Sequence, residues 1–308
     1  MEAAPAAAPP AVSLRLGLAP GSRPLLTLAT LWQGPPDPAM RFVDGGVLRA
    51  THTEQGPATL RVRFGAEEAL AEAWGPGATV ALERAPGLLG QLDEPSHLRP
   101  QHPLVRDLAR RFAGVRMTRA GSVYEPLLAT IIGQKVTSFE ARRSYRLLLQ
   151  RWGEPAPGPG GLLLPPAPEQ LARLPYHVLH PLGLERRRAD ALRVAAGAAR
   201  ALQRLADERP AGLGPALASL PGIGAWSTAE VLRLVLGDPD AVSVGDYNLP
   251  NLVGWALAGE RRADDARMLE LLEPYRGQRA RVVQLLELSG LYPPRRGPRL
   301  APRSIAAI

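Results

Sequence analysis

The segment LPGIG at residues 220–224 has the residue types of a turn that binds phosphate. Gly222 and Gly224 can adopt positive φ and let another backbone come close. A helix predicted to begin near Ala225 leaves its first amides free, and together with the turn amides these point toward one spot that suits a phosphate. A packing corner between two helices would use the same residues, so the segment alone leaves both interpretations open.

Asp246 is the carboxylate whose position is most suggestive of chemistry. It follows Gly224 by 22 residues and stands where another helix is predicted to begin. The dipole of that helix favours the ionised form of the side chain. A fixed carboxylate can stabilise positive charge that develops in a transition state, and it can orient or deprotonate water. Taken alone, however, the position fits a helix N-cap better, and the two roles are compatible.

A second loop contains Lys135, which is the only lysine of the chain. Apart from the histidines, every other basic residue is arginine. Thr137 and Glu140 have the spacing of a capping box at the start of a helix. Residues 133–136 are therefore predicted to form a short loop between two helices, with Gln134 and Lys135 at its centre. A solvated surface lysine is the alternative interpretation.

The sequence pattern of the segments that must position these residues predicts an α+β fold. In this fold a small N-terminal sheet-containing domain precedes an all-α domain. Residues 1–12 form an expected disordered tail. Residues 13–97 form the α+β domain, with alternating strand patterns, a hairpin turn at 44–46 and helices over 67–74 and 79–89. Residues 98–290 are helical apart from a Pro/Gly-rich surface linker at 154–168, and residues 291–308 are a Pro/Arg-rich tail.

Composition narrows the class of protein. The net charge of +8 favours a polyanionic partner, although an arginine-rich coding bias explains part of it. The chain has no cysteine, which excludes disulfides, thiolate zinc sites and iron–sulfur clusters. Neither a secretory signal nor an apolar run of membrane-spanning length is visible. The expected location is therefore cytoplasmic and associated with the nucleoid.

The stretch LPGIGAWSTA at 220–229, the VGDYNLP segment around Asp246 and the GQKVT loop at 133–137 together resemble the helix-hairpin-helix DNA glycosylase superfamily. The resemblance covers roughly residues 98–290 and is strongest to the 3-methyladenine DNA glycosylase II branch. It implies a monomer that acts on double-stranded DNA with a damaged base, needs no cofactor and hydrolyses the N-glycosidic bond of alkylated purines. Asp246 would stabilise the cation that develops on the sugar.

The same resemblance assigns roles around Asp246. The family members that also cleave the strand carry a lysine just after the hairpin, and Trp226 stands there in this chain. We therefore expect a monofunctional enzyme. Trp226 and Tyr247 are the candidate walls of the base pocket, although core packing is the alternative for both. The family's best-known alkyl-base member has a tryptophan late in its last helix, but residues 282–288 contain no aromatic.

On the DNA side, the resemblance places Lys135 where a side chain fills the gap left by the flipped base. Gln134 would contact the partner strand, Thr137 would lie on the same surface, and Gly222 and Gly224 would approach a phosphate. Hairpins of this family often bind a monovalent cation through backbone carbonyls, which here would belong to Ala218, Leu220 and Ile223. His177 and His180 have no third ligand nearby in the sequence, so we do not expect them to bind a metal.

Three alternatives remain at this point. The chain could be a glycosylase for another class of lesion, such as oxidised or deaminated bases. It could be a DNA-binding protein that keeps the hairpin without the chemistry. It could also be a helical scaffold without DNA affinity.

Overall fold

The computed structural model describes residues 10–294, and its first part is an antiparallel sheet. The strand order is β1-β5-β4-β3-β2. A two-residue turn joins β2 to β3, in which Val43 pairs with Gly46, so the predicted hairpin is confirmed. The strands are β1 (Val12–Gly17), β2 (Met40–Val43), β3 (Gly46–Thr53), β4 (Gly56–Phe64) and β5 (Glu68–Trp74).

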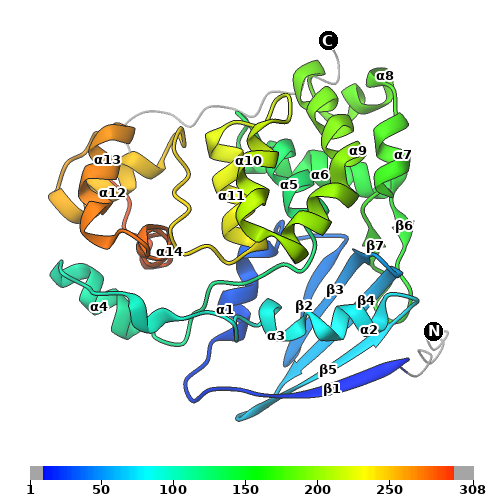
Figure 1. The fold of residues 1–308 in the computed structure, drawn as a ribbon, viewed down its shortest axis with the longest axis horizontal. Coiled ribbons are helices and arrows are strands. Elements are labelled where there is room, and N and C mark those ends of the chain that lie inside the picture. The colour runs from blue at the N-terminus through cyan, green and yellow to red at the C-terminus, as the bar shows by residue number, and fades with distance from the viewer. Residues whose placement is uncertain (1–9, 295–308) are drawn as a thin grey trace.

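Three short helices accompany the sheet (Figure 1). They are α1 (Pro24–Leu28), α2 (Ala78–Glu83) and α3 (Ala85–Leu88). The alanines at 69, 71 and 73 of β5 are fully buried in the core that the sheet shares with α2 and α3. The predicted helix over 67–74 is therefore wrong. Its alanine-rich sequence favours a helix, but pairing with β1 and β4 on both sides outweighs that preference.

The Pro/Gly-rich segment at 154–168 is not a free linker. It forms a second, two-stranded sheet from β6 (Glu154–Pro155) and β7 (Leu163–Leu164). Leu162 and Leu164 pack on Leu48 and Ala50 of β3 and form a separate small core. The segment therefore anchors the helical part of the chain to the sheet.

The rest of the described chain is helical, which confirms the predicted α+β fold. The helices are α4 (Pro103–Arg111), α5 (Tyr124–Gly133), α6 (Ser138–Trp152), α7 (Pro168–Arg173), α8 (Tyr176–Leu179), α9 (Arg186–Glu208), α10 (Leu213–Ala218), α11 (Ala225–Val235), α12 (Leu249–Ala258), α13 (Asp265–Leu272) and α14 (Arg279–Ser289). Short 3₁₀ turns occupy Ala29–Leu31, Pro95–His97, His180–Leu182, Pro210–Gly212 and Glu273–Tyr275. Between residues 10 and 294, no helix has both the length and the apolar character needed to cross a membrane.

These helices pack into two separate hydrophobic cores. We call the first the hairpin core, which is formed by α5 to α11 and includes Ile223 of the 220–224 turn. We call the second the C-terminal core, in which α4 joins α12, α13 and α14. Figure 1 shows α12 to α14 standing beside α11, with the chain crossing from one core to the other after α11. The seam between the cores is where the candidate residues meet.

Residues 1–9 and 295–308 lie outside the described residues, and they include most of the two predicted tails. Within the described part, β1 begins at Val12, the last residue of the predicted N-terminal tail. The boundary predicted near residue 97 falls between α3 and α4.

Candidate functional site

The turn between α10 and α11 has one glycine that the backbone requires. Gly222 has a φ of +86°, and a Cβ there would lie 2.8 Å from the Cβ of Ala191 in α9. Gly224 is extended, with a φ of −101° and a ψ of −173°, so positive φ is needed at only one of the two glycines. The space around Gly224 is open, which leaves its backbone accessible from outside.

The backbone amides at this turn are available to an anion. Gly224 precedes the first turn of α11 and supplies no side-chain cap. Within residues 10–294, the amides of 224–227 have no acceptor, since the first helical bond there runs from the Thr228 amide to the Gly224 carbonyl at 2.9 Å. Gly224 and Ala225 are exposed and Trp226 is half-buried, so their free amides form a surface that suits a phosphate oxygen, whereas Ser227 is buried.

Asp246 lies at the seam, three residues before Leu249, the first residue of α12, so the helix begins later than predicted and Asn248 holds the N-cap position. The Oδ1 of Asp246 accepts the backbone amides of Asn248 at 2.8 Å and Leu249 at 2.9 Å and so fixes the turn that leads into the helix. Its Oδ2 accepts the indole N–H of Trp226 from the first turn of α11, at 3.0 Å. Three donors thus fix the orientation of a half-buried carboxyl, which remains partly accessible from solvent.

The two candidate pocket aromatics differ in their surroundings. Trp226 is half-buried and is anchored to Asp246, whereas the side chain of Tyr247 is 87% exposed. Core packing therefore does not explain Tyr247. An aromatic ring exposed to this extent, one residue from a fixed carboxyl, is available to contact a ligand.

The loop between α5 and α6 is tied to the hairpin. The side-chain amide of Gln134 donates to the Gly222 carbonyl at 2.9 Å and to the Ser227 hydroxyl at 2.8 Å. These two bonds hold the loop against the hairpin, a positioning role of Gln134 that the sequence did not indicate. The loop itself holds Lys135 exposed with a φ of +55°, a conformation that is uncommon for a residue with a side chain. The predicted capping box of Thr137 and Glu140 is confirmed.

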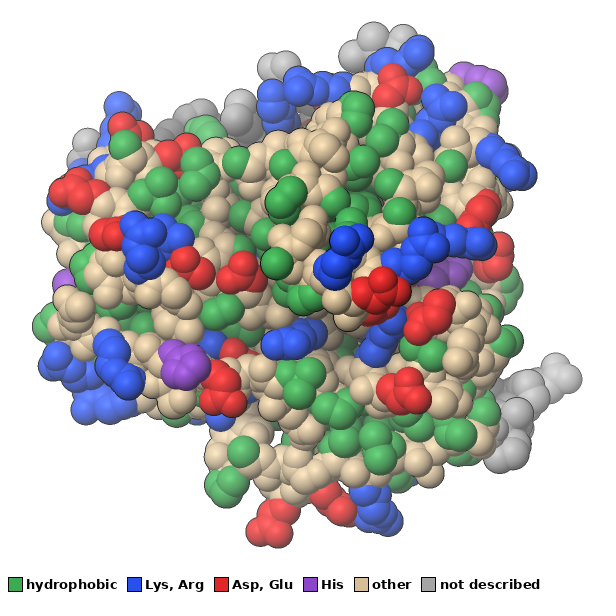
Figure 2. Space-filling view, viewed as in Figure 1, with side chains coloured by type: hydrophobic (Ala, Val, Ile, Leu, Met, Phe, Trp, Pro, Cys, Tyr) green, Lys and Arg blue, Asp and Glu red, His purple; other side chains and the backbone are tan. Residues whose placement is uncertain are grey.

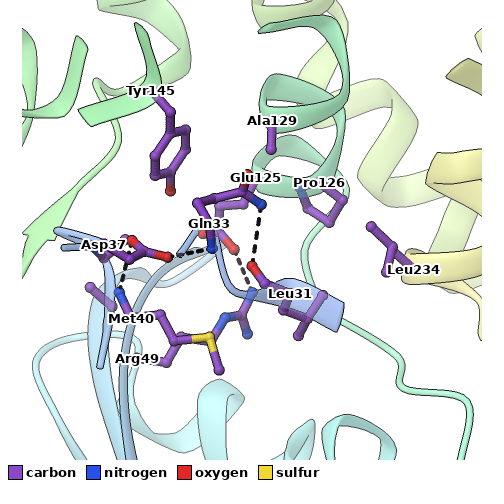
Figure 3. Close-up of a pocket in the computed structure, with 12 residues that line it drawn as sticks. Leu31, Gln33, Asp37, Met40, Arg49, Glu125, Pro126, Ala129, Tyr145 and Leu234 are labelled. Carbon is purple, nitrogen blue, oxygen red and sulfur yellow. Dashed lines mark hydrogen bonds and ion pairs between the residues drawn. The ribbon is translucent and has the colours of Figure 1, made fainter. Parts of the chain in front are cut away.

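The sheet holds the opposite end of α5. Arg49 and Glu125, both about one-tenth exposed, form an ion pair at 2.7 Å, and Glu125 also accepts the Thr51 hydroxyl at 2.8 Å and the His52 amide at 2.7 Å. Figure 3 shows Arg49 and Glu125 among the side chains around a cavity of about 40 Å³ between the sheet and α5. That volume accommodates water and is too small for a nucleobase. The cavity is thus part of the joint that fixes α5.

A buried polar network continues along α11 beyond Trp226. Glu230 pairs with Arg233 at 2.8 Å and accepts the Ser243 hydroxyl from the segment that leads to Asp246. Burial alone would raise the pKa of Glu230, but Arg233 and Ser243 lower it overall. The i,i+3 spacing of Glu230 and Arg233 fits an ion pair on a helix, but the sequence gives no signal for the contact of Glu230 with Ser243.

Within residues 10–294, no three His, Cys, Asp or Glu side chains gather as a metal-binding group. At the hairpin, the carbonyls of Ala218 and Ile223 accept no hydrogen bond in that part of the chain, and the Leu220 carbonyl accepts only the Ile223 amide at 3.1 Å. These oxygens have lone pairs available for a monovalent cation.

Solved structures with the same fold are DNA glycosylases, while the sequence matches no family profile and no curated protein. A 3-methyladenine DNA glycosylase from Archaeoglobus fulgidus aligns with a TM-score of 0.74 and 20% identity over 89% of this chain and 97% of its own. The apo form of an 8-oxoguanine glycosylase/lyase from Clostridium acetobutylicum aligns with a TM-score of 0.69 and 12% identity over 91% and 97%. The 3-methyladenine DNA glycosylase Mag1 of Schizosaccharomyces pombe aligns with a TM-score of 0.52 and 18% identity over 66% and 98%.

These likenesses confirm that the chain has the fold of the helix-hairpin-helix DNA glycosylases. The neighbours act on different lesions, since two are named for 3-methyladenine and one for 8-oxoguanine. The fold therefore does not identify the damaged base, nor whether the strand is cleaved. Both depend on the side chains of this chain.

Proposed function

We propose that this chain, with the fold of the helix-hairpin-helix DNA glycosylases, is a monofunctional DNA glycosylase that binds duplex DNA and hydrolyses alkylated purines from it. The observation that carries the proposal is the fixed Asp246 carboxyl beside the hairpin. Loss of a base builds positive charge on the deoxyribose, and a carboxylate oriented in advance by three donors stabilises that charge without reorganising.

The hairpin and the 133–136 loop supply the DNA-binding surface in this proposal. The free amides of 224–226 bind a backbone phosphate, and Gly222 and Gly224 keep the turn narrow enough for the strand to approach. Lys135 enters the duplex from the neighbouring loop, where its alkyl stem fills the gap left by the extruded base. Gln134 holds the two elements together, and its carbonyl remains available to the partner strand; Thr137 stays at the edge of this surface as the cap of α6.

Base recognition falls to the aromatic residues around Asp246. A methylated purine carries positive charge, which the electron-rich faces of Trp226 and Tyr247 attract. Trp226 also occupies the position of an amine nucleophile, so the enzyme has no side chain there to form a Schiff base. A monovalent cation on the carbonyls of Ala218, Leu220 and Ile223 would add positive charge under the docked phosphate.

Base release from methylated genomic DNA, with each free base identified by mass, tests the proposal directly. The wild type should release methylated purines, and Asp246→Asn should reduce the rate by roughly 10²- to 10³-fold. The asparagine retains an oxygen that can accept the amides of Asn248 and Leu249, so we expect duplex binding and the melting temperature to stay close to the wild type. A wild type that binds duplex DNA but releases no base from any lesion would identify a non-catalytic binding protein instead.

Borohydride reduction of the reaction mixture tests the absence of lyase chemistry. We expect no covalent protein–DNA complex and an intact strand at the abasic site. A trapped complex that persists in Lys135→Ala would contradict the proposal, because the variant has no lysine left. A trapped complex lost in that variant would assign the amine chemistry to Lys135.

A further inference from the structure

The first turn of α6 presents an aromatic side chain to solvent. Phe139 is 62% exposed and lies four residues after Lys135 and two after Thr137, the cap of the helix. Further along α6, Tyr145 and Leu148 are buried in the hairpin core, so the exposed ring is not part of that packing. Single exposed apolar side chains are common on protein surfaces, and the role of this one therefore depends on its surroundings.

The segment that carries Phe139 is held in place on both sides. Before it, the side chain of Gln134 donates to the Gly222 carbonyl at 2.9 Å, which holds the loop against the hairpin. After it, the capping box closes, because the Glu140 amide donates to the Thr137 hydroxyl at 3.2 Å and the Glu140 carboxylate accepts the Thr137 amide at 2.9 Å. The ring of Phe139 therefore starts from a backbone that is fixed relative to the hairpin.

Arginines without a partner lie close to Phe139. Arg142 and Arg143 follow it on α6, and Arg187 lies in the first turn of α9. Arg142 and Arg187 are exposed and Arg143 is half-buried. Within residues 10–294, none of the three makes a hydrogen bond or an ion pair. Their guanidinium groups are therefore available to an anionic partner.

The carboxylates of α6 and of the start of α9 are already engaged. Glu140 belongs to the capping box. Glu185 lies 3.7 Å from Arg188, and Asp190 pairs with Arg186 at 2.9 Å. Figure 2 shows Lys and Arg side chains along the upper edge of the helical part, near the position of α8 in Figure 1. This part of the surface therefore keeps an excess of positive charge.

The start of α9 is joined to the end of α5 beside α6. The buried Arg188 donates to the Ile132 carbonyl of α5 at 2.8 Å and to the Gly183 carbonyl at 3.0 Å. A Cβ at Gly183 would lie 3.9 Å from the Nη1 of Arg143. Arg187 follows Gly183 by four residues, so it belongs to the same region of the surface as Arg143 and the loop after α5.

We propose that this region binds the DNA strand opposite the damaged base. We call it the α6–α9 surface, and its members are Phe139, Arg142, Arg143 and Arg187. The inference rests on the proposed function and deepens it. The chain runs from the hairpin through Gln134 to Lys135 and then to Phe139, so the surface lies beyond the side chain that fills the gap. Four residues span at most about 14 Å, which places Phe139 within about four base-pair steps of the gap.

The two kinds of side chain have different tasks on this strand. Extrusion of the damaged base leaves its former partner unpaired, and the ring of Phe139 stacks on that base. The arginines bind the phosphates on either side of it and release counterions from the DNA. A ring among arginines is the combination that binds unpaired nucleic acid, because stacking and phosphate contacts need no base pair.

Stacking also determines what the enzyme reads on the partner strand. Every base has a π-face, so an aromatic ring holds all four bases in a similar way, whereas hydrogen bonds to base edges would select one. We therefore expect the rate of base release to be nearly independent of the base opposite the lesion.

Two duplexes of the same sequence test the role of Phe139, one undamaged and one with a tetrahydrofuran abasic analogue that has no base to extrude. By fluorescence anisotropy, Phe139→Ala should lose roughly 10- to 100-fold in affinity for the analogue duplex and about threefold or less for the undamaged one. Phe139→Tyr keeps a ring and should bind like the wild type, whereas the apolar but ringless Phe139→Leu should resemble the alanine variant. Leu92→Ala, which truncates a side chain 53% exposed in the N-terminal domain, is the control.

The arginines are tested by the salt dependence of binding. Arg143→Gln and Arg187→Gln should weaken both duplexes alike, and each should reduce the slope of log affinity against log salt by about one. Arg204→Gln is the matched control, because Arg204 is an exposed arginine of the same helix α9, 17 residues or about 25 Å beyond Arg187. It should change neither the affinity nor the slope.

Other outcomes would overturn the inference. If Phe139→Ala or Phe139→Leu bound the analogue duplex as tightly as the wild type, the ring would not stack on DNA, and the proposed function would stand without it. If the wild type self-associated in sedimentation and Phe139→Ala abolished this without a change in DNA affinity, the surface would belong to a second copy of the chain. A wild type that releases no base would remove the proposed function, whereas these binding measurements would still test the surface.

Discussion

The indole N–H of Trp226 and the Oδ2 of Asp246 lie 3.0 Å apart, and this hydrogen bond joins two cores that pack separately. Trp226 lies in the first turn of α11, which belongs to the hairpin core. Asp246 accepts the amides of Asn248 and Leu249 at the entry to α12, which belongs to the C-terminal core. The orientation of the candidate catalytic carboxyl is therefore set from both sides of the seam.

Trp226→Phe should separate this orienting role from the role of the aromatic face. The variant keeps a ring for the base but removes the donor to Oδ2. A hydrogen bond to a charged group is worth about 1.5–3 kcal/mol, so we expect the single-turnover rate to fall roughly 10- to 100-fold. Duplex affinity, measured by fluorescence anisotropy, should remain near that of the wild type. An unchanged rate would show that the two Oδ1 bonds alone position Asp246.

The backbone strain at Lys135 can be measured separately from the proposed role of its side chain in DNA, because its φ of +55° suits glycine better than lysine. Lys135→Gly and Lys135→Ala both remove the side chain proposed to enter the duplex, so both should slow base release. The glycine variant should be the more stable by about 1 kcal/mol in urea unfolding.

Arg41→Ala, which removes an exposed cation from β2, is the matched control for Lys135 and should leave base release unchanged. If Lys135 also reaches a phosphate, its loss should reduce the salt dependence of binding by about one unit of slope. Identical base release in wild type and Lys135→Ala would rule out the proposed insertion.

The buried pair of Arg49 and Glu125 predicts a role for the N-terminal domain. Glu125→Ala leaves a buried arginine without its partner and should lower the free energy of unfolding by about 3–5 kcal/mol. The double variant Arg49→Met with Glu125→Leu removes both charges and should recover much of that loss. Chemical denaturation measures both. A small effect of Glu125→Ala would mean that the sheet does not fix α5 through this pair.

Acid stability should depend on Glu230. Its pKa is lower in the folded chain than its ordinary value of 4.5. The stability that its ionised form contributes is therefore complete above that value and is lost as the pH falls through the folded pKa. Urea unfolding between about pH 3 and 7 should show a shallower acid loss in Glu230→Gln than in the wild type. Parallel curves for the two proteins would assign the acid sensitivity to other carboxyls.

The sequence predicted the parts of the site that depend on local chemistry. The capping box at Thr137 and the tight turn at Gly222 each follow from a few neighbouring residues, and the structure contains both, whereas α12 begins three residues later than the start predicted at Asp246. Where long-range packing determines the local structure, the prediction from sequence was wrong. The segment 68–74 is alanine-rich yet lies between two strands, and Leu162 and Leu164 dock on β3 from a segment that resembles a linker.

Gln134 illustrates the same limit at the site. Its side-chain bond to the Gly222 carbonyl joins residues that lie 88 positions apart in the sequence, so it becomes visible only when the loop between α5 and α6 packs against the hairpin.

The two-core arrangement means that neither half of the helical domain is sufficient for the site. The hairpin amides, Lys135 and Trp226 are supplied by elements of the hairpin core, whereas Asp246 and Tyr247 precede α12 of the C-terminal core. A substitution that shifts one core against the other would therefore disturb the hydrogen bond between Trp226 and Asp246 without replacing either residue.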